Sequence, residues 1–337
     1  MENKSLFLPA EWHPQTAIQL TWPSAESDWV GHLTEARACV RQMIEIITRY
    51  QKVLLVHSDA IDRGAVFSDI PEERLQLAHL PTNDTWCRDY GPITVLENGQ
   101  PQLLDFQFNG WGLKFPADQD NQVTKRLHEK GFLGNIPIDS KALVLEGGSI
   151  ESDGAGTLLT TSTCLLSPNR NPTYGKEALE KKFRELFGTE RVLWLDHGHL
   201  LGDDTDAHID TLARFCNPTT IAYVQCSDPA DPHHAGLQKM EQQLQSFRRP
   251  DGQPYTLVPL PLPQPLYATD GHRLPATYAN FLILNGAVLV PTYGVAQDKS
   301  ALKILKKIFP DREVIGIDCR VLVEQHGSLH CMTMQLL

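Results

Sequence analysis

Short apolar segments separated by polar turns run along the whole chain and predict strands that alternate with helices. Near the N-terminus, the predicted strands cover residues 17–21, 52–57 and 74–80. Apolar residues recur at helical spacing over residues 35–50, between the first two of these strands. This order predicts strands around an α-helical crossover, which is typical of an α/β protein.

From residue 93 onward, a unit of hairpin, helix and strand recurs. Asn98 and Gly99, which accept a left-handed backbone at both turn positions, join the two strands of the first hairpin. The predicted hairpins pair residues 93–96 with 102–106, 142–145 with 157–161, 209–215 with 220–225, and 281–284 with 287–290. Predicted helices follow at residues 121–130, at 176–187, after 231 and at 300–309, with further strands at 192–195 and 313–317.

Polar motifs fall at matching places in these units. Asp84 to Asp89, Glu146, His208, Asn280 and Cys331 are separated by roughly 60, 62, 72 and 51 residues. A ββαβ unit repeated at this period predicts a circular arrangement whose first strands point their ends at one axis. An open mixed α/β sheet with hairpins is the alternative that the pattern leaves open.

Composition indicates an ordinary globular protein without a linker. At 337 residues, a folded chain buries roughly 75% of its extended surface, which allows one large domain or two smaller ones. The 23 glycines and 23 prolines are spread along the chain as turn residues and mark no boundary. We therefore expect a single catalytic domain over residues 1–337.

Charge and cysteine usage narrow the partners and the compartment. Thirty Lys and Arg against 41 Asp and Glu give a formal charge of −11, which argues against nucleic acid and anionic membrane as partners. The seven cysteines are scattered and form no Cys-x-x-Cys motif, which favours a reducing compartment. The N-terminus has no apolar export signal, and no run approaches the length of a membrane span. These observations predict a cytoplasmic location.

Two short motifs suggest a cation-binding site. Trp86 lies close to Asp89 in a polar stretch that ends at Pro92, and an aromatic face beside a carboxylate can receive a cation. The same stretch could instead be a simple turn. Glu146 ends an apolar strand and is followed by two glycines that allow close approach of a ligand or a backbone. A glutamate satisfied by turn amides is the alternative there.

The His- and Asp-rich segment 197–210 allows three interpretations. His197, His199, Asp206 and Asp210 could bind a divalent metal ion. His208 and Asp210 alone, at a spacing of two on a strand, would point into one cavity. The run could also be a solvated loop.

Cys331 is the candidate nucleophile. It follows a turn of small residues, Gly327 and Ser328, and His208 is available as its base. His330, adjacent on an extended strand, would face the opposite way and is not expected to be the base. The default for the other thiols is a buried, inert side chain, which we apply to Cys39, Cys164, Cys226 and Cys319.

Together these motifs resemble the agmatine deiminase and bacterial-type peptidylarginine deiminase family, a branch of the guanidino-group modifying enzymes. The matching segments are Trp86 to Pro92, the stretch around Asn109 to Phe115, Glu146 to Gly148, Asp204 to Asp210, Thr277 to Phe281 and Gln325 to Thr333. Ala207 replaces a glycine of the family pattern. Gln325, His326, Gly327 and Ser328 stand where that pattern has three glycines and an asparagine.

The resemblance implies a five-bladed pseudo-symmetric α/β propeller of ββαβ modules, the pentein fold. It also implies hydrolysis of a guanidinium to a urea with release of ammonia, through a covalent thiouronium on Cys331 and without a metal or organic cofactor. His208 would transfer protons, and Glu146 would hold its imidazolium. Asp89 and Asp210 would clamp the guanidinium, and Trp86 would line the pocket.

The expected substrate is a small guanidino cation. Agmatine, which yields N-carbamoylputrescine on the route to putrescine, comes first, and arginine in a peptide comes second. Asp84, Asp203 and Asp204 are possible partners for a distal ammonium. A metal-dependent hydrolase and a non-catalytic, cation-binding propeller are the remaining alternatives, and a homo-oligomer is possible.

Overall fold

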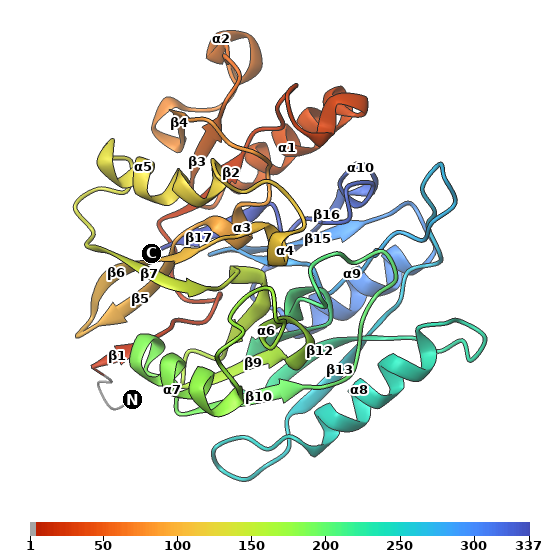
Figure 1. Ribbon diagram of the computed structural model, residues 1–337. Helices are drawn as coiled ribbons and strands as arrows, with labels where there is room; N and C mark the ends of the chain where they lie inside the picture. The colour runs from red at the N-terminus through yellow and green to blue at the C-terminus, as the bar shows by residue number, and fades with distance from the viewer. Residues whose placement is uncertain (1–4) are drawn as a thin grey trace.

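The computed structural model describes residues 5–337. The first four residues, part of the segment in which no export signal is expected, lie outside the described residues. Within the described part, none of the helices combines the length and apolar character that crossing a bilayer requires. The longer helices α1, α5, α7, α8 and α9 lie toward the outside of the molecule, whereas the short helices α3 and α4 lie near its middle (Figure 1).

The strands form five separate sheets, so the alternative of one open sheet is wrong. The sheets, with strands in spatial order, are β1 (Leu6–Phe7), β5 (Ile93–Glu97), β6 (Gln100–Gln107) and β7 (Ile138–Val144); β10 (Arg191–Leu195), β9 (Thr157–Thr161) and β8 (Ile150–Ser152); β11 (Ala213–Asn217), β12 (Thr220–Gln225) and β13 (Thr256–Pro261); β14 (Leu282–Ile283), β15 (Ala287–Thr292) and β16 (Glu313–Asp318); and β17 (Thr333–Leu336), β2 (Ala17–Thr21), β3 (Lys52–His57) and β4 (Leu75–His79).

Each sheet contains an antiparallel pair followed by a parallel strand, and a helix connects the second strand of the pair to that parallel strand. These connecting helices are α5 (Val123–Glu129), α7 (Lys176–Phe187), α8 (His234–Ser246), α9 (Gln297–Ile308) and α1 (Leu33–Ile47). In α1, Val40, Met43, Ile44 and Ile47 recur at helical spacing and are all buried. The predicted hairpin–helix–strand unit is therefore present.

Shorter helices connect the strands near the polar motifs. The α-helical turns are α2 (Arg63–Val66), α3 (Cys87–Tyr90), α4 (Gly110–Leu113), α6 (Ser162–Leu165) and α10 (Arg320–Val323), and the 3-10 turns are η1 (Asp28–Gly31), η2 (Glu72–Arg74), η3 (Asp120–Gln122), η4 (Gly147–Ser149) and η5 (Ile209–Thr211).

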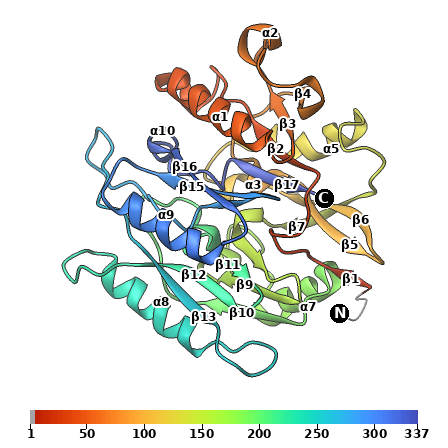
Figure 2. The ribbon, with the colours of Figure 1, turned by 180° about the vertical axis from the view of Figure 1, so that it is seen from behind.

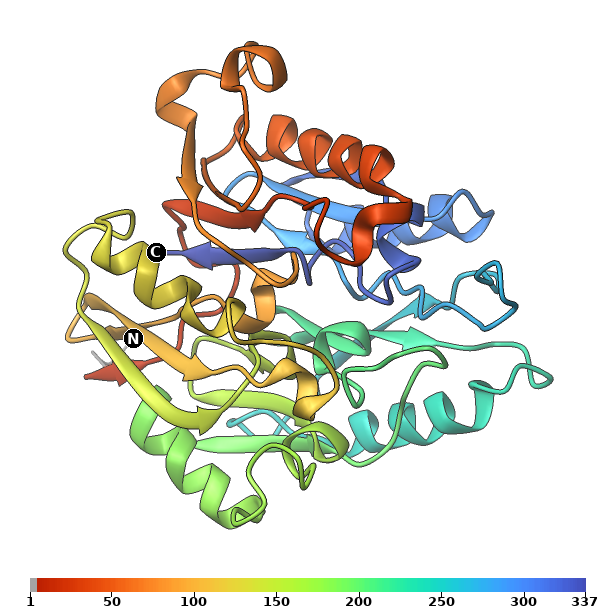
Figure 3. The same cartoon turned by 45° about the horizontal axis from the view of Figure 1, so that its top comes forward.

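The C-terminal strand joins the sheet that also contains β2, β3 and β4. Strand β17 pairs antiparallel with β2, with Thr333 opposite Leu20 and Leu336 opposite Ala17. Figure 3 shows the dark-blue C-terminal strand beside the red strand β2. Strand β1 and the C-terminus both lie on the left in Figure 1 and on the right in the reverse view of Figure 2. This pairing puts the turn that carries Cys331 next to the N-terminal part of the fold.

Two predicted strands are wrong in detail. Residues 142–145 do not begin the second hairpin, because β7 runs parallel to β6 and completes the previous sheet. The hairpin begins at β8, after the Glu-Gly-Gly turn. Residues 209–211 form a 3-10 turn, not the start of a strand, because Thr211 bonds back to the His208 carbonyl through both its amide and its hydroxyl.

Candidate active site

Five polar residues lie at equivalent positions in the five sheets. Asp89, Glu146, His208, Asn280 and Cys331 each come just before the first strand of an antiparallel pair. That position explains the period seen in the sequence. All five side chains are buried, so each needs a partner or a ligand.

Gly148 marks the point where three of the predicted groups meet. A Cβ added at Gly148 would lie 2.7 Å from Nδ1 of His208, 2.8 Å from Oδ1 of Asp89 and 3.1 Å from Oδ2 of Asp210. The Gly148 amide donates to Oδ1 of Asp89 at 2.9 Å. Three residues from two distant segments therefore surround one residue that has no side chain, and the glycine makes room for them.

Cys331 lies at the same centre. Its Sγ is 3.3 Å from Nδ2 of Asn280 and 3.7 Å from Oδ2 of Asp210. The Asn280 side-chain oxygen accepts the amides of His330 and Cys331 at 2.9 and 3.3 Å, which fixes the turn. Burial and the carboxylates of Asp210 and Asp89 raise the pKa of Cys331 well above its usual value, against the opposing effect of the Ser328 amide and Asn280. The free protein therefore favours the thiol.

His208 is set up to carry a proton. Its side chain is fully buried, and its Nδ1 lies 3.6 Å from Oδ1 of Asp89. Neither ring nitrogen makes a hydrogen bond within residues 5–337. Burial alone would lower the pKa of His208, but Asp89, the Cys164 sulfur and Glu146 raise it well above the usual value. The imidazolium form is favoured, with Asp89 near Nδ1 and the Cys164 sulfur near the ring.

Glu146 acts on His208 through charge. Both of its carboxylate oxygens accept Nε of Arg170 at 2.9 Å, and both side chains are inaccessible to solvent. A carboxylate oxygen of Glu146, the sulfur of Cys164 and a ring nitrogen of His208 all lie within 4.8 Å of one another. Among the described residues, the side-chain hydrogen bonds of Glu146 come from Arg170 and from no imidazole. Cys164, expected to be merely inert, borders the histidine.

The sequence reasoning did not assign Trp111 to the site. Its indole N–H donates to Oδ2 of Asp89 at 2.8 Å, so Asp89 is held by Trp111 and Gly148 together. Trp111 and Leu113 have φ values of 55° and 68°, a left-handed conformation that side chains rarely adopt. The sequence did contain a signal for Trp111, because the stretch from Asn109 to Phe115 resembles a segment of the family. No role was assigned to that stretch.

Protonation of Asp89 should lower kcat/KM at acid pH. Burial raises the pKa of Asp89 to about 6. Below that pH the carboxyl is neutral and loses its attraction for a cation, so kcat/KM should fall by about tenfold for each pH unit below 6. The measurement is the pH profile of ammonia release at low agmatine concentration. A profile that stays flat between about pH 5 and 8 would contradict this assignment.

A cavity of about 220 Å³ opens beside these groups. Its lining residues are Asp28, Asp84, Trp86, Asp89, Trp111, Phe115, Asp203, Asp204, Thr205, Thr211, Gln325, His326, Gly327 and Cys331. The Trp86 indole donates to Asp84 at 3.1 Å and packs against Gly327, where an added Cβ would lie 2.2 Å from the ring. The cavity thus combines Trp86 and Asp89 with the three acids expected near a distal ammonium, and adds Asp28.

The altered turn before Cys331 contributes to the rim of this cavity. His326 takes a left-handed backbone, with φ of 66°, where the family pattern has a glycine. Its Nδ1 contacts the Gly202 carbonyl at 2.5 Å. Ser328 hydrogen-bonds the hydroxyl of Tyr293 at 2.9 Å. These contacts hold the turn in place with residues that differ from the family pattern.

The proposed metal ligands do not come together. His197 and His199 are exposed, whereas Asp210 is buried. Asp206 is bound by Arg170 at 2.6 Å and Lys114 at 2.7 Å. Within residues 5–337, the clusters able to hold an ion contain none of the four residues. The metal hypothesis for this segment is therefore wrong.

Gly148→Ala should reduce activity sharply. The new methyl group would collide with His208 and Asp89, and overpacking of this kind costs about 1–3 kcal/mol. We expect kcat/KM to fall while the far-ultraviolet circular dichroism spectrum is retained. Gly175→Ala is the matched control, because an added Cβ there meets nothing within 4 Å. Equal activity of the two variants would contradict the convergence at Gly148.

Comparison with known proteins identifies the family of the chain. The model of the Porphyromonas-type peptidyl-arginine deiminase family matches residues 7–336. An agmatine deiminase of Stutzerimonas stutzeri is 32% identical over 352 residues, covering 98% of this chain and 95% of that protein. The chain therefore belongs to the Porphyromonas-type peptidyl-arginine deiminase family.

Solved structures are similar over nearly the whole chain. A protein from Porphyromonas gingivalis, provisionally named an arginine deiminase, is 54% identical with a TM-score of 0.91, covering 98% of this chain and 97% of that chain. Substrate-bound agmatine deiminase from C. jejuni is 39% identical with a TM-score of 0.92, covering 98% and 96%. An amidinotransferase from Microseira wollei, at 11% identity and a TM-score of 0.57, shares the mixed α/β fold alone.

Proposed function

We propose that this chain is an agmatine deiminase that hydrolyses the guanidinium of agmatine to N-carbamoylputrescine and ammonia. The observation that carries the choice of substrate is the charge of the cavity. Beyond Asp89, it is lined by Asp28, Asp84, Asp203 and Asp204, and none of its described lining residues is Lys or Arg. Agmatine has a cation at each end, whereas free arginine would bring its carboxylate against these acids.

The size of the cavity supports the same choice. Its volume of about 220 Å³ lies below the range of about 300–1,000 Å³ typical of pockets for drug-sized ligands. Relatives named agmatine deiminase, from Stutzerimonas stutzeri and C. jejuni, are similar over almost the full length. Peptidyl-arginine, which would use the same chemistry, is the second candidate because the matching family model carries that name.

The chemistry follows from the residues at the centre. Asp89 and Asp210 hold the guanidinium, and its positive charge favours the thiolate of Cys331 in a site that otherwise favours the thiol. The thiolate attacks the guanidinium carbon, His208 protonates the departing amine, and ammonia leaves a thiouronium on sulfur. Water then attacks the same carbon, and His208 takes one of its protons. The carbon–sulfur bond breaks, the second proton of the water restores the thiol of Cys331, and the urea product leaves.

We further propose that the five sheets are the blades of a propeller and that the chain is one catalytic domain. The five equivalent positions ahead of the hairpins, and the pairing of β17 with β2, support this arrangement. All seven cysteines are free and buried, which supports a reducing, cytoplasmic location.

A comparison of three substrates tests the function. We expect ammonia release from agmatine with a kcat/KM at least about tenfold higher than with free arginine or a blocked arginine peptide, because one favourable charge contact is worth about 1.4 kcal/mol or more. The peptide lacks the distal ammonium but also lacks a free carboxylate, so it should rank above free arginine. A higher kcat/KM with the peptide would assign the chain to peptidyl-arginine instead.

A further inference from the structure

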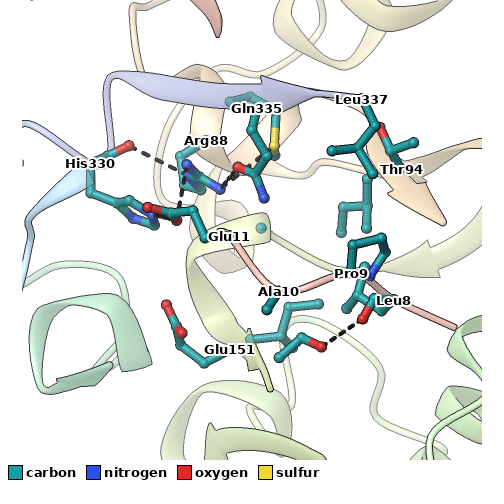
Figure 4. A pocket seen from close by; sticks show the side chains of 15 residues that line it. Leu8, Pro9, Ala10, Glu11, Arg88, Thr94, Glu151, His330, Gln335 and Leu337 are labelled. Atoms are coloured by element: carbon teal, nitrogen blue, oxygen red, sulfur yellow. Dashed lines mark hydrogen bonds and ion pairs between the residues drawn. The ribbon is translucent and has the colours of Figure 1, made fainter. Parts of the chain in front are cut away.

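His330 lies between two buried carboxylates. Its Nδ1 contacts Oδ2 of Asp210 at 2.8 Å, and its Nε2 contacts Oε2 of Glu11 at 2.6 Å. Figure 4 shows Glu11 beside His330 and Arg88 at one side of a second, smaller cavity of about 50 Å³. The ring therefore links this second cavity to a residue of the guanidinium site.

A hydrogen bond at each ring nitrogen requires a proton on each, so the two contacts favour an imidazolium between the two carboxylates. Burial and the guanidinium groups of Arg214 and Arg88 oppose this and lower the pKa of His330, whereas Glu11 and the contact with Asp210 raise it. Arg214, which donates to Oε2 of Glu11 at 2.8 Å, offsets the negative charge of that carboxylate inside the protein.

Glu11 is itself held firmly. Its Oε1 accepts the Ile283 amide at 2.6 Å, and Nη2 of Arg88 lies 3.8 Å from its Oε2. Because Glu11 cannot turn without breaking these contacts, it fixes the plane of the His330 ring. The ring in turn fixes Oδ2 of Asp210, whereas Oδ1 of Asp210 has no hydrogen-bond partner among the described residues.

A metal ion is a poor explanation of this cluster. Glu11, Glu151 and His330 lie close enough to share an ion. Arg214, however, already binds both carboxylates, through Nη2 to Glu11 and Nε to Glu151. A cation placed there would meet the guanidinium of Arg214 at short range.

We propose that His330 and Glu11 form a positioning pair that holds the Asp210 carboxylate in the orientation required to bind the guanidinium. The side chains of the pair make no hydrogen bond to the Cys331 sulfur or the His208 ring, and their contact with the guanidinium site is the one to Asp210. The inference rests on the proposed function only in taking a guanidino cation as the ligand.

Two substitutions of His330 separate positioning from packing. An asparagine amide reaches about where Nδ1 lies and can still donate to Asp210, whereas a glutamine amide reaches toward the position of Nε2. We expect His330→Gln to raise the KM for agmatine about ten- to hundredfold, as when the outer partner of a ligating group is removed. The KM of the His330→Asn variant should stay within about threefold of that of the unchanged chain, and in both variants kcat should change less than KM.

A matched pair of glutamates provides the second test. Glu11 and Glu151 are both buried, both bind Arg214, and each accepts one backbone amide, but only Glu11 touches His330. Glu11→Gln should raise KM by about tenfold and Glu151→Gln by less than about twofold. Both variants must first show a cooperative thermal unfolding transition, which demonstrates that they are folded.

Equal effects of His330→Gln and His330→Asn, or of Glu11→Gln and Glu151→Gln, would overturn the proposal. If the unchanged chain released no ammonia from agmatine, the proposed function would fail separately. The same four variants would then be compared by calorimetric titration with agmatine, and the same ranking of dissociation constants is expected. Absence of any agmatine binding by the unchanged chain would overturn both.

Discussion

Ammonia release from agmatine should fall by about 10,000-fold or more when Cys331 is replaced by serine. Serine keeps the approximate size of the side chain, but its hydroxyl is a far weaker nucleophile than a thiolate. Asp89 and Asp210 are unchanged in this variant, so agmatine should still bind. Steady-state kinetics and calorimetric binding measure the two effects separately.

Two controls accompany that experiment. Cys226→Ser removes another buried thiol, whose sulfur donates to the Asp228 carbonyl away from the cavity, and should leave activity within about twofold. A chelator should also have little effect on the unchanged chain. Full activity of the Cys331→Ser variant, or loss of activity of the unchanged chain when a chelator is added, would point to a metal-dependent hydrolase in place of the thiol mechanism.

Replacing His208 by asparagine should lower kcat by about 100- to 10,000-fold, the range expected for loss of a general acid–base group. The side chain is fully buried beside Asp89, and in the proposed mechanism it gives the departing amine its proton. His199→Asn is the matched control, because His199 is exposed and lies in the same histidine-rich segment. Similar losses in both variants would contradict the role of His208.

The sequence predicted the arrangement better than the individual contacts. The recurrence of polar residues at Asp89, Glu146, His208, Asn280 and Cys331 follows from the ββαβ period, because each precedes the first strand of a hairpin. Hydrophobic periodicity also located the connecting helices to within a few residues. These features are local in the chain and therefore readable from it.

Other features could not be read locally. Strand β13 contains Pro259 and Pro261, and proline weakens the sequence signal for a strand. The two prolines are tolerated because β13 lies at the edge of its sheet. His208 and Asp210 were expected on one strand, yet they reach the same centre from a 3-10 turn.

The partners of the central residues depend on tertiary packing. Arg170 binds Glu146, Trp111 binds Asp89, and Glu11 contacts His330, across sequence separations of 24, 22 and 319 residues. No spacing rule in a single sequence connects such pairs. They become visible only when the five sheets are assembled.

The most direct test is the covalent state of Cys331 during turnover. The protein is mixed with agmatine, quenched in acid within milliseconds, digested and analysed by mass spectrometry. The mechanism predicts a peptide containing Cys331 that has gained the mass of agmatine less ammonia. Two results would contradict the account. One is product formation with no such adduct in either the unchanged chain or the His208→Asn variant, and the other is an adduct on Cys164 instead of Cys331.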